Sequence, residues 1–299
     1  MSSLLGSTGN HPDYENYLKT IGAAEERDNI FAASCYCPIT NLDNADMAYE
    51  WEFNGLNDYH RTIFHRDESG KDVIIPQEGN MTETQIRLSN ELKVLFPKYL
   101  NSLNLKDDNG NELTLDNDGN GTFKEFIKAK VISSIDKELE QGTDLSEFDW
   151  IKIENKKVKS IDFTKYINFR RRQKVTPAFD SISMGTPENE LFGTEYVKER
   201  HFTEFSKKHS ICDGELADKN QIKMMNPMYY IEDSKSDKAK YYRIRHGAID
   251  RDTSLAISAM LSLKLENNGI NVDFQYPWGK SHDGDYDLEE LFNWIDNIV

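Results

Sequence analysis

The stretch YYRIRHGAIDRDTSLAISAMLSLKLENNGINVDFQYPWGKSHDGDYDLEELFNWIDNIV, residues 241 to 299, contains the pattern that decides the fold. Tyr241 to His246 predicts a short strand, and Ile270 to Tyr276 alternates apolar and polar residues as a half-buried strand does. Between them, Thr253 to Glu266 carries apolar residues at helical spacing and ends before Gly269. The order of strand, acidic loop, helix, strand and histidine loop predicts part of an α/β fold.

The two predicted loops carry side chains suited to acid–base catalysis. Asp250 and Asp252 follow the first strand, and His282 follows the second. A serine hydrolase needs a histidine that takes the hydroxyl proton and an acid that orients the histidine, and α/β-hydrolases hold them in the order Ser, Asp, His. The spacing therefore predicts the last two members of a triad. The alternatives are a helix N-cap at Asp252 and a solvated loop histidine.

The last segment of the chain predicts an amphipathic helix that starts at Asp287. Glu290 lies three residues further on, as in a capping box. The apolar residues at helical spacing predict its buried face, namely Leu288, Leu291, Phe292, Trp294, Ile295 and Ile298.

Composition narrows the class of protein. The 299 residues suit one large or two ordinary domains, and a hydrophobic content of 37% is enough for a folded core. The net charge of −16 argues against nucleic acid or an anionic membrane as a partner, and the sequence has no apolar run of the ~18 residues that span a bilayer. Three cysteines without a Cys-x-x-Cys motif indicate reduced thiols and no structural zinc, which favours the cytoplasm.

The beginning of the sequence predicts a sheet without its first strands. Met1 to Gly6 resembles the interior of a buried helix, with neither a cap nor a preceding strand. Ile30 to Cys37 is a continuous small and apolar run, which fits a parallel strand that needs neighbours on both sides. We therefore expect the sequence to start inside a domain, so that it says nothing of a signal peptide. We also expect an exposed, apolar sheet edge that promotes association.

The middle of the chain, residues 53 to 238, predicts a large and mainly helical lid. Apolar periodicity predicts helices over Asp43 to Phe53, Met81 to Leu100 and Thr122 to Glu138, and alternation over Trp150 to Ile161 predicts a small hairpin. A region of this length is not a loop but an insertion. The predicted domains are an incomplete α/β core, residues 1–52 and 239–299, and a lid, residues 53–238.

A local pattern in the middle region imitates a calcium site. Residues 116 to 121, DNDGNG, copy the first half of an EF-hand loop, but Ile127 occupies the position where the bidentate Glu is required. The pattern therefore predicts a polar turn that leads into a helix.

Six segments of the sequence resemble successive blocks of the bacterial tannases, or tannin acyl hydrolases, in the same order along the chain. These segments are SSLLGSTGN, YCPITNLDNADMAYEWEFNG, FRRRQKVTPAFDS, ENELFGTE, RHGAIDRDTSLAI and PWGKSHDGDYDLEELFNWID. The family consists of α/β-hydrolase esterases that cleave galloyl esters. The resemblance implies the C-terminal part of an α/β-hydrolase fold, a serine carboxylesterase activity without cofactor or metal, and a small phenolic ester as substrate.

The resemblance also implies roles for five residues. Asp250 would be the triad acid and His282 the triad base, while Lys174, Glu188 and Asp252 would hold the phenolic hydroxyls of the galloyl ring. The chemistry suits these roles, because phenols donate to carboxylates and a nearby ammonium keeps both carboxylates charged. Without the family, Lys174 would be read as part of a solvated basic run and Glu188 as part of a polar turn.

The main departure from the family is the nucleophile. A nucleophile elbow reads Gly-x-Ser-x-Gly, and the sequence contains no such pentapeptide. In the family the serine lies a few residues before the segment matched by MSSLLG, so the chain alone is expected not to hydrolyse esters by a triad. The alternatives are a feruloyl-type or general esterase and a non-catalytic fragment that binds phenolics.

Overall fold

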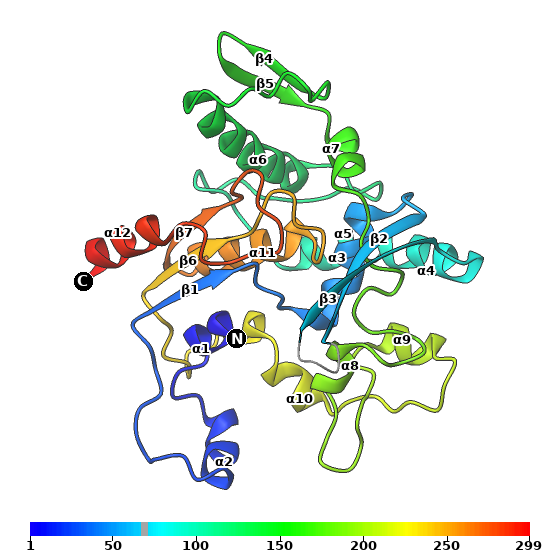
Figure 1. Cartoon of the computed structure of the whole chain (residues 1–299). Coiled ribbons are helices and arrows are strands. Elements are labelled where there is room, and N and C mark those ends of the chain that lie inside the picture. The colour runs from blue at the N-terminus through cyan, green and yellow to red at the C-terminus, as the bar shows by residue number, and fades with distance from the viewer. Residues whose placement is uncertain (67–70) are drawn as a thin grey trace.

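A three-stranded parallel sheet lies at the centre of the molecule (Figure 1). The structure, a computed structural model, describes residues 1–66 and 71–299. The sheet has the order β1-β6-β7, formed by β1 (Ala32–Tyr36), β6 (Tyr241–Arg245) and β7 (Asn271–Gln275). These strands coincide with the three predicted from the sequence, so that prediction is confirmed. Among the described strands, β1 pairs with β6 alone.

The helix α11 (Leu255–Asn267) connects β6 to β7 and is buried from Leu255 to Leu265. A helix that is apolar on most sides must be enclosed, and α11 packs against β7. It begins at Ser254, whose Oγ accepts from the Ala256 amide at 3.2 Å. The alternative that Asp252 caps this helix is therefore wrong, and the Asp252 carboxylate is left for other contacts.

The predicted helix at the beginning of the chain is also present. It is α1 (Ser2–Ser7), which packs on β1, and it is followed by α2 (Pro12–Thr20). Ser7 Oγ lies 2.9 Å from Tyr242 Oη. Gly6 allows this close packing, because a Cβ there would lie 2.3 Å from Tyr242 Oη. One face of α1, with Ser3, Gly6 and Ser7, is therefore buried against the sheet, whereas Leu5 is 50% exposed.

The middle region contains more helix than strand, as predicted, together with two antiparallel hairpins. The hairpin β4 (Ile151–Glu154) and β5 (Lys157–Ile161) was predicted, but the longer antiparallel hairpin β2 (Asp58–Arg66) and β3 (Asp72–Asn80) was not. The remaining helices are α3 (Leu42–Phe53), α4 (Glu83–Lys93), α5 (Phe96–Ser102), α6 (Thr122–Glu140), α7 (Phe163–Arg170), α8 (Pro187–Leu191), α9 (Glu204–His209), α10 (Lys219–Met224) and the 3₁₀ turn η1 (Pro227–Tyr229).

The helix predicted over residues 81–100 is divided into α4 and α5. Pro97 explains the break, because it has no amide hydrogen for the i−4 carbonyl and its ring would clash with that carbonyl. Proline is favoured near the start of a helix, and Pro97 lies in the first turn of α5.

The turn before α6 is polar, as predicted from the incomplete calcium pattern. Asp116 Oδ1 accepts hydrogen bonds from the amides of Asp118 at 2.9 Å and Asn120 at 2.8 Å. The carboxylate therefore stabilises the turn itself.

None of the helices in the described residues combines the length and the apolar composition that a membrane span requires.

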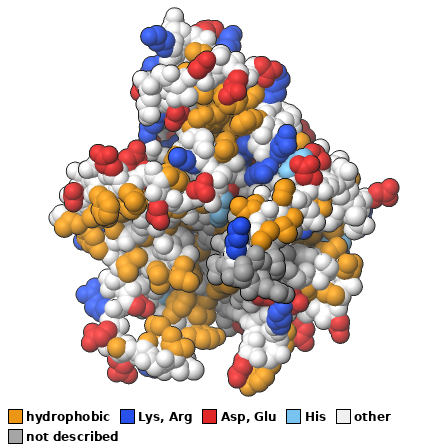
Figure 2. All heavy atoms as spheres, in the orientation of Figure 1, with side chains coloured by type: hydrophobic (Ala, Val, Ile, Leu, Met, Phe, Trp, Pro, Cys, Tyr) orange, Lys and Arg blue, Asp and Glu red, His pale blue; other side chains and the backbone are white. Residues whose placement is uncertain are grey.

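The last helix, α12 (Leu288–Ile298), is present, but two of its predicted features are wrong. Asp287 forms no capping hydrogen bond and pairs instead with the buried Arg243. A buried guanidinium needs a carboxylate partner, which outweighs a cap worth about 1 kcal/mol. The predicted buried face is not covered either, since Phe292 is 60% exposed. Figure 1 shows α12 projecting from the sheet, and a hydrophobic patch lies over it in Figure 2.

Candidate active site

Asp250 and His282 meet where the loops after β6 and β7 come together. His282 Nδ1 lies 2.9 Å from Asp250 Oδ2, and Asp250 Oδ1 accepts from the Asp252 amide at 2.7 Å. Asp250 is fully buried, whereas the His282 side chain is 39% exposed. The buried carboxylate thus orients an imidazole whose other nitrogen, Nε2, can be reached from outside.

The two loops are held together by their backbones. The amide of Ala248 donates to Pro277 O at 2.9 Å, and the amide of Ile249 donates to Lys280 O at 3.0 Å. Gly247 makes this approach possible, because a Cβ on Gly247 would lie 2.2 Å from Lys280 O. The separation of the acid from the histidine is therefore fixed by main-chain contacts.

The environment shifts the pKa of both groups. The hydrogen bond that His282 donates to Asp250 raises the pKa of His282, opposed in part by burial. Burial alone would raise the pKa of Asp250, but the interactions with His246 and His282 hold it well below its ordinary value. Asp250 is therefore a carboxylate that stabilises the protonated form of His282.

The three remaining residues implied by the resemblance lie at the same place. Lys174 Nζ is 3.1 Å from Asp252 Oδ1 and 3.8 Å from Glu188 Oε1. The side chains of Lys174, Asp252 and Glu188 are 20%, 21% and 13% exposed. His282 Nε2 lies 3.6 Å from Asp252 Oδ2, so Asp252 joins this group to the acid–histidine pair. All five predicted residues converge on one partly exposed site.

Sequence reasoning missed the side chains that hold Lys174 and Asp252. Tyr49, buried in α3, accepts from the Lys174 amide at 3.0 Å and donates to Arg251 O at 3.0 Å, which joins two segments of the site. Gln173 Nε2 donates to Asp252 Oδ1 at 2.9 Å, and Lys174 Nζ lies 4.1 Å from the centre of the Phe179 ring. No sequence pattern indicated these contacts, because Tyr49 and Lys174 are 125 residues apart in the sequence, and Gln173 and Asp252 are 79 residues apart.

The basic run that precedes Lys174 is not a solvated surface. The Arg170 and Arg172 side chains are fully buried and pair with the buried carboxylates of Glu52 and Glu50. Arg170 also donates to the main-chain oxygen of Asp250. Charges buried in this way are tolerated when they are paired. The run therefore anchors the site to α3.

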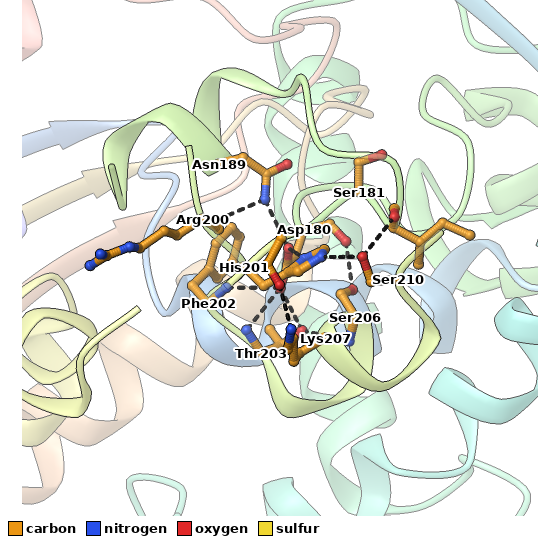
Figure 3. A network of polar contacts seen from close by, with 12 residues as sticks. Asp180, Ser181, Asn189, Arg200, His201, Phe202, Thr203, Ser206, Lys207 and Ser210 are labelled. Atoms are coloured by element: carbon orange, nitrogen blue, oxygen red, sulfur yellow. Dashed lines mark hydrogen bonds and ion pairs between the residues drawn. The ribbon is translucent and has the colours of Figure 1, made fainter. Parts of the chain in front are cut away.

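A second set of aspartate, histidine and serine side chains lies beneath α8, the helix that carries Glu188 (Figure 3). His201 Nδ1 is 2.8 Å from Asp180 Oδ1, and His201 Nε2 is 2.9 Å from Ser210 Oγ. We call Asp180, His201 and Ser210 the closed cluster. It has the residue types of a triad, although the sequence analysis did not single it out.

The surroundings of the closed cluster do not suit nucleophilic catalysis. His201 is fully buried, and Ser210 Oγ lies 2.9 Å from the main-chain oxygen of Cys212 and 3.4 Å from that of Ile182. A reacting ester would need hydrogen-bond donors at this place, and these two groups are acceptors. Asp180 also accepts from the side chains and amides around it, including Asn189 Nδ2 at 2.8 Å. The cluster therefore stabilises the loop that bears Glu188.

A metal ligand set can be drawn beside the acid–histidine pair. Among the described residues, Cys37, Asp250 and His282 place ligand atoms within 4.8 Å of one another. Burial raises the pKa of the Cys37 thiol to about 12, and its Sγ lies 3.5 Å from the main-chain oxygens of Ser281 and Asp283. The neutral thiol thus donates to main-chain oxygens of the histidine loop, while His282 contacts Asp250. A neutral thiol is a poor metal ligand.

Comparison with known proteins gave one kind of match. No family model and no curated protein matched the chain. Among solved structures, the tannase from Lactobacillus plantarum is 42% identical with a TM-score of 0.96, and the match covers 99% of this chain and 64% of that one. The tannase from Fusobacterium nucleatum is 52% identical with a TM-score of 0.92, and the match covers 99% of this chain and 65% of that one.

A third match is a tannin acyl hydrolase in complex with ethyl gallate, at 42% identity and a TM-score of 0.92, which covers 99% of this chain and 62% of that one. This chain therefore spans less than two thirds of the length of these relatives. The likeness extends over nearly all of its own residues, in sequence and in fold. The chain belongs to the tannase family.

Proposed function

We propose that this chain supplies the acid–base pair and the ring-binding groups of a serine carboxylesterase that hydrolyses galloyl esters. The observation that carries the proposal is the meeting of two groups of side chains at one accessible place. The pair Asp250–His282 adjoins the group Lys174, Asp252 and Glu188, with His282 Nε2 at 3.6 Å from Asp252. Structures of related proteins with ethyl gallate and with 3,4-dihydroxybenzoate support a phenolic ligand.

In the proposed reaction, Asp250 accepts the Nδ1 hydrogen of His282 and leaves Nε2 as the base. Nε2 takes the proton of a serine hydroxyl while the serine oxygen attacks the ester carbonyl, and then gives that proton to the departing alcohol. Water repeats the sequence on the acyl-enzyme and releases the acid. Among the described residues no serine hydroxyl hydrogen-bonds to His282, so the proposal assigns the nucleophile to residues outside this sequence.

The ring-binding group explains why the acyl part should carry vicinal hydroxyls. Phenolic hydroxyls donate, and the carboxylates of Glu188 and Asp252 accept, while Lys174 contacts a phenolic oxygen and balances their charge. A ring that lacks a hydroxyl leaves a partly buried carboxylate without its partner, which costs binding free energy. A feruloyl-type or general esterase is the second candidate, and it would tolerate this loss.

The test is a calorimetric titration of the chain with gallate, 3,4-dihydroxybenzoate and benzoate. We expect affinity to fall with each hydroxyl removed. Lys174→Ala should weaken gallate binding at least tenfold, roughly 1.4 kcal/mol, while Lys198→Ala, at a side chain that is 78% exposed, should not. Equal binding of gallate and benzoate would contradict the proposed ring recognition.

The assignment of the nucleophile has its own measurement. With an activated phenolic ester, the chain alone should give no burst of acyl-enzyme, because His282 has no serine hydroxyl to deprotonate. The non-catalytic alternative predicts the same result for the chain alone. Activity that is restored by a polypeptide carrying a nucleophile elbow, and lost again in His282→Gln, would separate the two.

We further propose that the chain associates through its uncovered apolar surfaces. β1 has a free edge among the described strands, and Phe292 on α12 is 60% exposed. Sedimentation at increasing concentration should show association. A sharp and reversible unfolding transition of a monomer would count against it.

A further inference from the structure

A second histidine faces the carboxylate of the proposed acid–base pair. His246 follows the last residue of β6 and is fully buried. Its Nε2 lies 3.1 Å from Asp250 Oδ2, the same oxygen that His282 Nδ1 contacts at 2.9 Å. The His246 ring is turned so that this contact is not a well-aligned hydrogen bond. One carboxylate oxygen is therefore shared between an exposed imidazole and a buried one.

The other side of the His246 ring is held by α11. His246 Nδ1 lies 2.7 Å from Ser258 Oγ, and Ser258 is fully buried. The His246 amide donates to Gln275 O at 3.1 Å, and the edge of the ring packs against Tyr276 at a centroid distance of 5.8 Å. The ring thus has one orientation, with Nε2 toward Asp250.

The buried carboxylate also decides which nitrogen of His246 carries the hydrogen. A lone pair on Nε2 would face the negative charge of the buried Asp250, which is costly where both groups are shielded from solvent. Nε2 therefore carries a hydrogen, and Nδ1, at 2.7 Å, accepts the hydroxyl hydrogen of Ser258 in preference to Leu255 O, the other acceptor of that hydroxyl at 3.2 Å. Ser258 thus orients His246, and the Nε2–H group of His246 faces Asp250 Oδ2.

We propose that His246 is a positioning residue for the Asp250–His282 pair: by placing its N–H on Asp250 Oδ2, it limits how strongly that carboxylate holds a proton on His282. The inference rests on the proposed function in that His282 is taken as the base. Two N–H groups near one oxygen compete for its charge, so the hydrogen bond from His282 is weaker than it would be alone, although the His246 contact is electrostatic and not a well-aligned hydrogen bond.

This restraint matters because a general base must be neutral near the pH at which it works. Asp250 and Asp252 both favour the protonated imidazole of His282, and Lys174 opposes them. Without His246, Oδ2 would bind the His282 N–H more strongly, and a larger fraction of His282 would be protonated and inactive as a base. His246 therefore sets the range of pH in which His282 can accept a proton.

The experiment is an NMR titration of the histidine rings in the whole chain, with His282 assigned from the signal that is missing in His282→Gln. His246→Leu should raise the proton affinity of His282 by roughly threefold. His246→Gln, which can keep a donor near Oδ2, should raise it less. A His282 titration that is unchanged or shifted to lower pH in a folded His246→Leu chain would overturn the proposal.

Ser258→Ala tests the orientation of His246, and Ser262→Ala is its matched control, because Ser262 is also fully buried in α11 but does not contact His246. Ser258→Ala should move the His282 titration in the same direction as His246→Leu, and Ser262→Ala should leave it in place.

If the His246→Leu chain fails to fold, the proposal is tested on the wild-type chain. The ¹⁵N shifts of the wild-type chain should show the hydrogen of His246 on Nε2, and a hydrogen on Nδ1 alone would overturn the proposal. Asp250→Asn distinguishes a failure of the proposed role of His246 from a failure of the proposed function. Loss of the raised His282 pKa in Asp250→Asn, together with no effect of His246→Leu, would reject the role of His246 and leave the proposed function intact.

Discussion

The pair Asp250–His282 and the closed cluster are built from the same chemistry in opposite surroundings. In both, a buried carboxylate accepts from a histidine Nδ1, at 2.9 Å for Asp250 and 2.8 Å for Asp180. The difference lies at the other ring nitrogen. His282 Nε2 can be reached from outside, whereas His201 is fully buried and its Nε2 is occupied by the half-buried Ser210. Residue types alone therefore do not identify a reactive site.

The polar groups around an acid–histidine pair therefore decide whether its imidazole is free to act as a base. Asp250 leaves one imidazole exposed beside the group for which we propose ring binding, while Asp180 accepts hydrogen bonds from several segments of the chain. These donors include Thr203 Oγ1 at 2.7 Å and the Phe202 amide at 3.0 Å. A carboxylate that accepts many internal hydrogen bonds stabilises a loop, and one that leaves a base accessible can support catalysis.

The largest expected effect breaks the closed cluster. Asp180→Ala should lower the free energy of unfolding by about 3–5 kcal/mol, because it removes a buried, charged acceptor and leaves His201 and several amides without their partner. Urea unfolding measures the change. Asp213→Ala is the control, since Asp213 is exposed in the same region and should change the midpoint little. Equal midpoints for the two variants would contradict a stabilising role of the cluster.

A smaller effect is expected at the open pair. Asp250→Asn should lower the pKa of His282 and cost about 1–3 kcal/mol of stability at neutral pH. The pKa of Asp250 is held below its ordinary 3.8, so its contribution is present above that pH and is lost as the pH falls further. The acid limb of an unfolding titration should flatten in the variant. His282→Gln, at an exposed side chain, should cost less, and the reverse order would contradict the asymmetry.

The sheet and the acid–histidine pair could be predicted because their signals are local. β6 and β7 each show a strand pattern that ends in a loop, and parallel strands bring such loops to one edge. Nothing local marks the partner of a buried charge. Arg170 and Glu52 are 118 residues apart in the sequence, and a run of arginines reads as a solvated surface until the fold pairs them.

One prediction was wrong and one element was missed. The face of α12 that includes Phe292 has the pattern of a buried helix, but periodicity cannot say which surface covers it. The β2–β3 hairpin was missed because Pro76 and the polar residues around it weaken the strand pattern. The proposed roles of Lys174 and Glu188 were inferred from the resemblance. The sequence pattern alone does not show that these two residues lie close together.

The smallest expected effect sharpens the comparison through a carboxylate next to the closed cluster. Asp46, fully buried in α3, accepts from the amides of Phe179 at 2.8 Å and Asp180 at 3.1 Å. Burial, together with the charge of Asp180, raises the pKa of Asp46 from 3.8 to about 7. The folded chain therefore holds a proton that the unfolded chain releases, so stability should fall as the pH rises from 3.8 to about 7.

Asp46→Asn should remove this slope, because the amide does not titrate. Urea midpoints at a series of pH values measure it. The matched control is Asp43→Asn, also in α3, where burial raises the pKa of Asp43 as well but the carboxylate contacts Tyr229 rather than the closed cluster. If the slope persists in Asp46→Asn and disappears in Asp43→Asn, the linked proton lies away from the closed cluster. The contrast between the closed cluster and the pair Asp250–His282 would then depend on Asp180 alone.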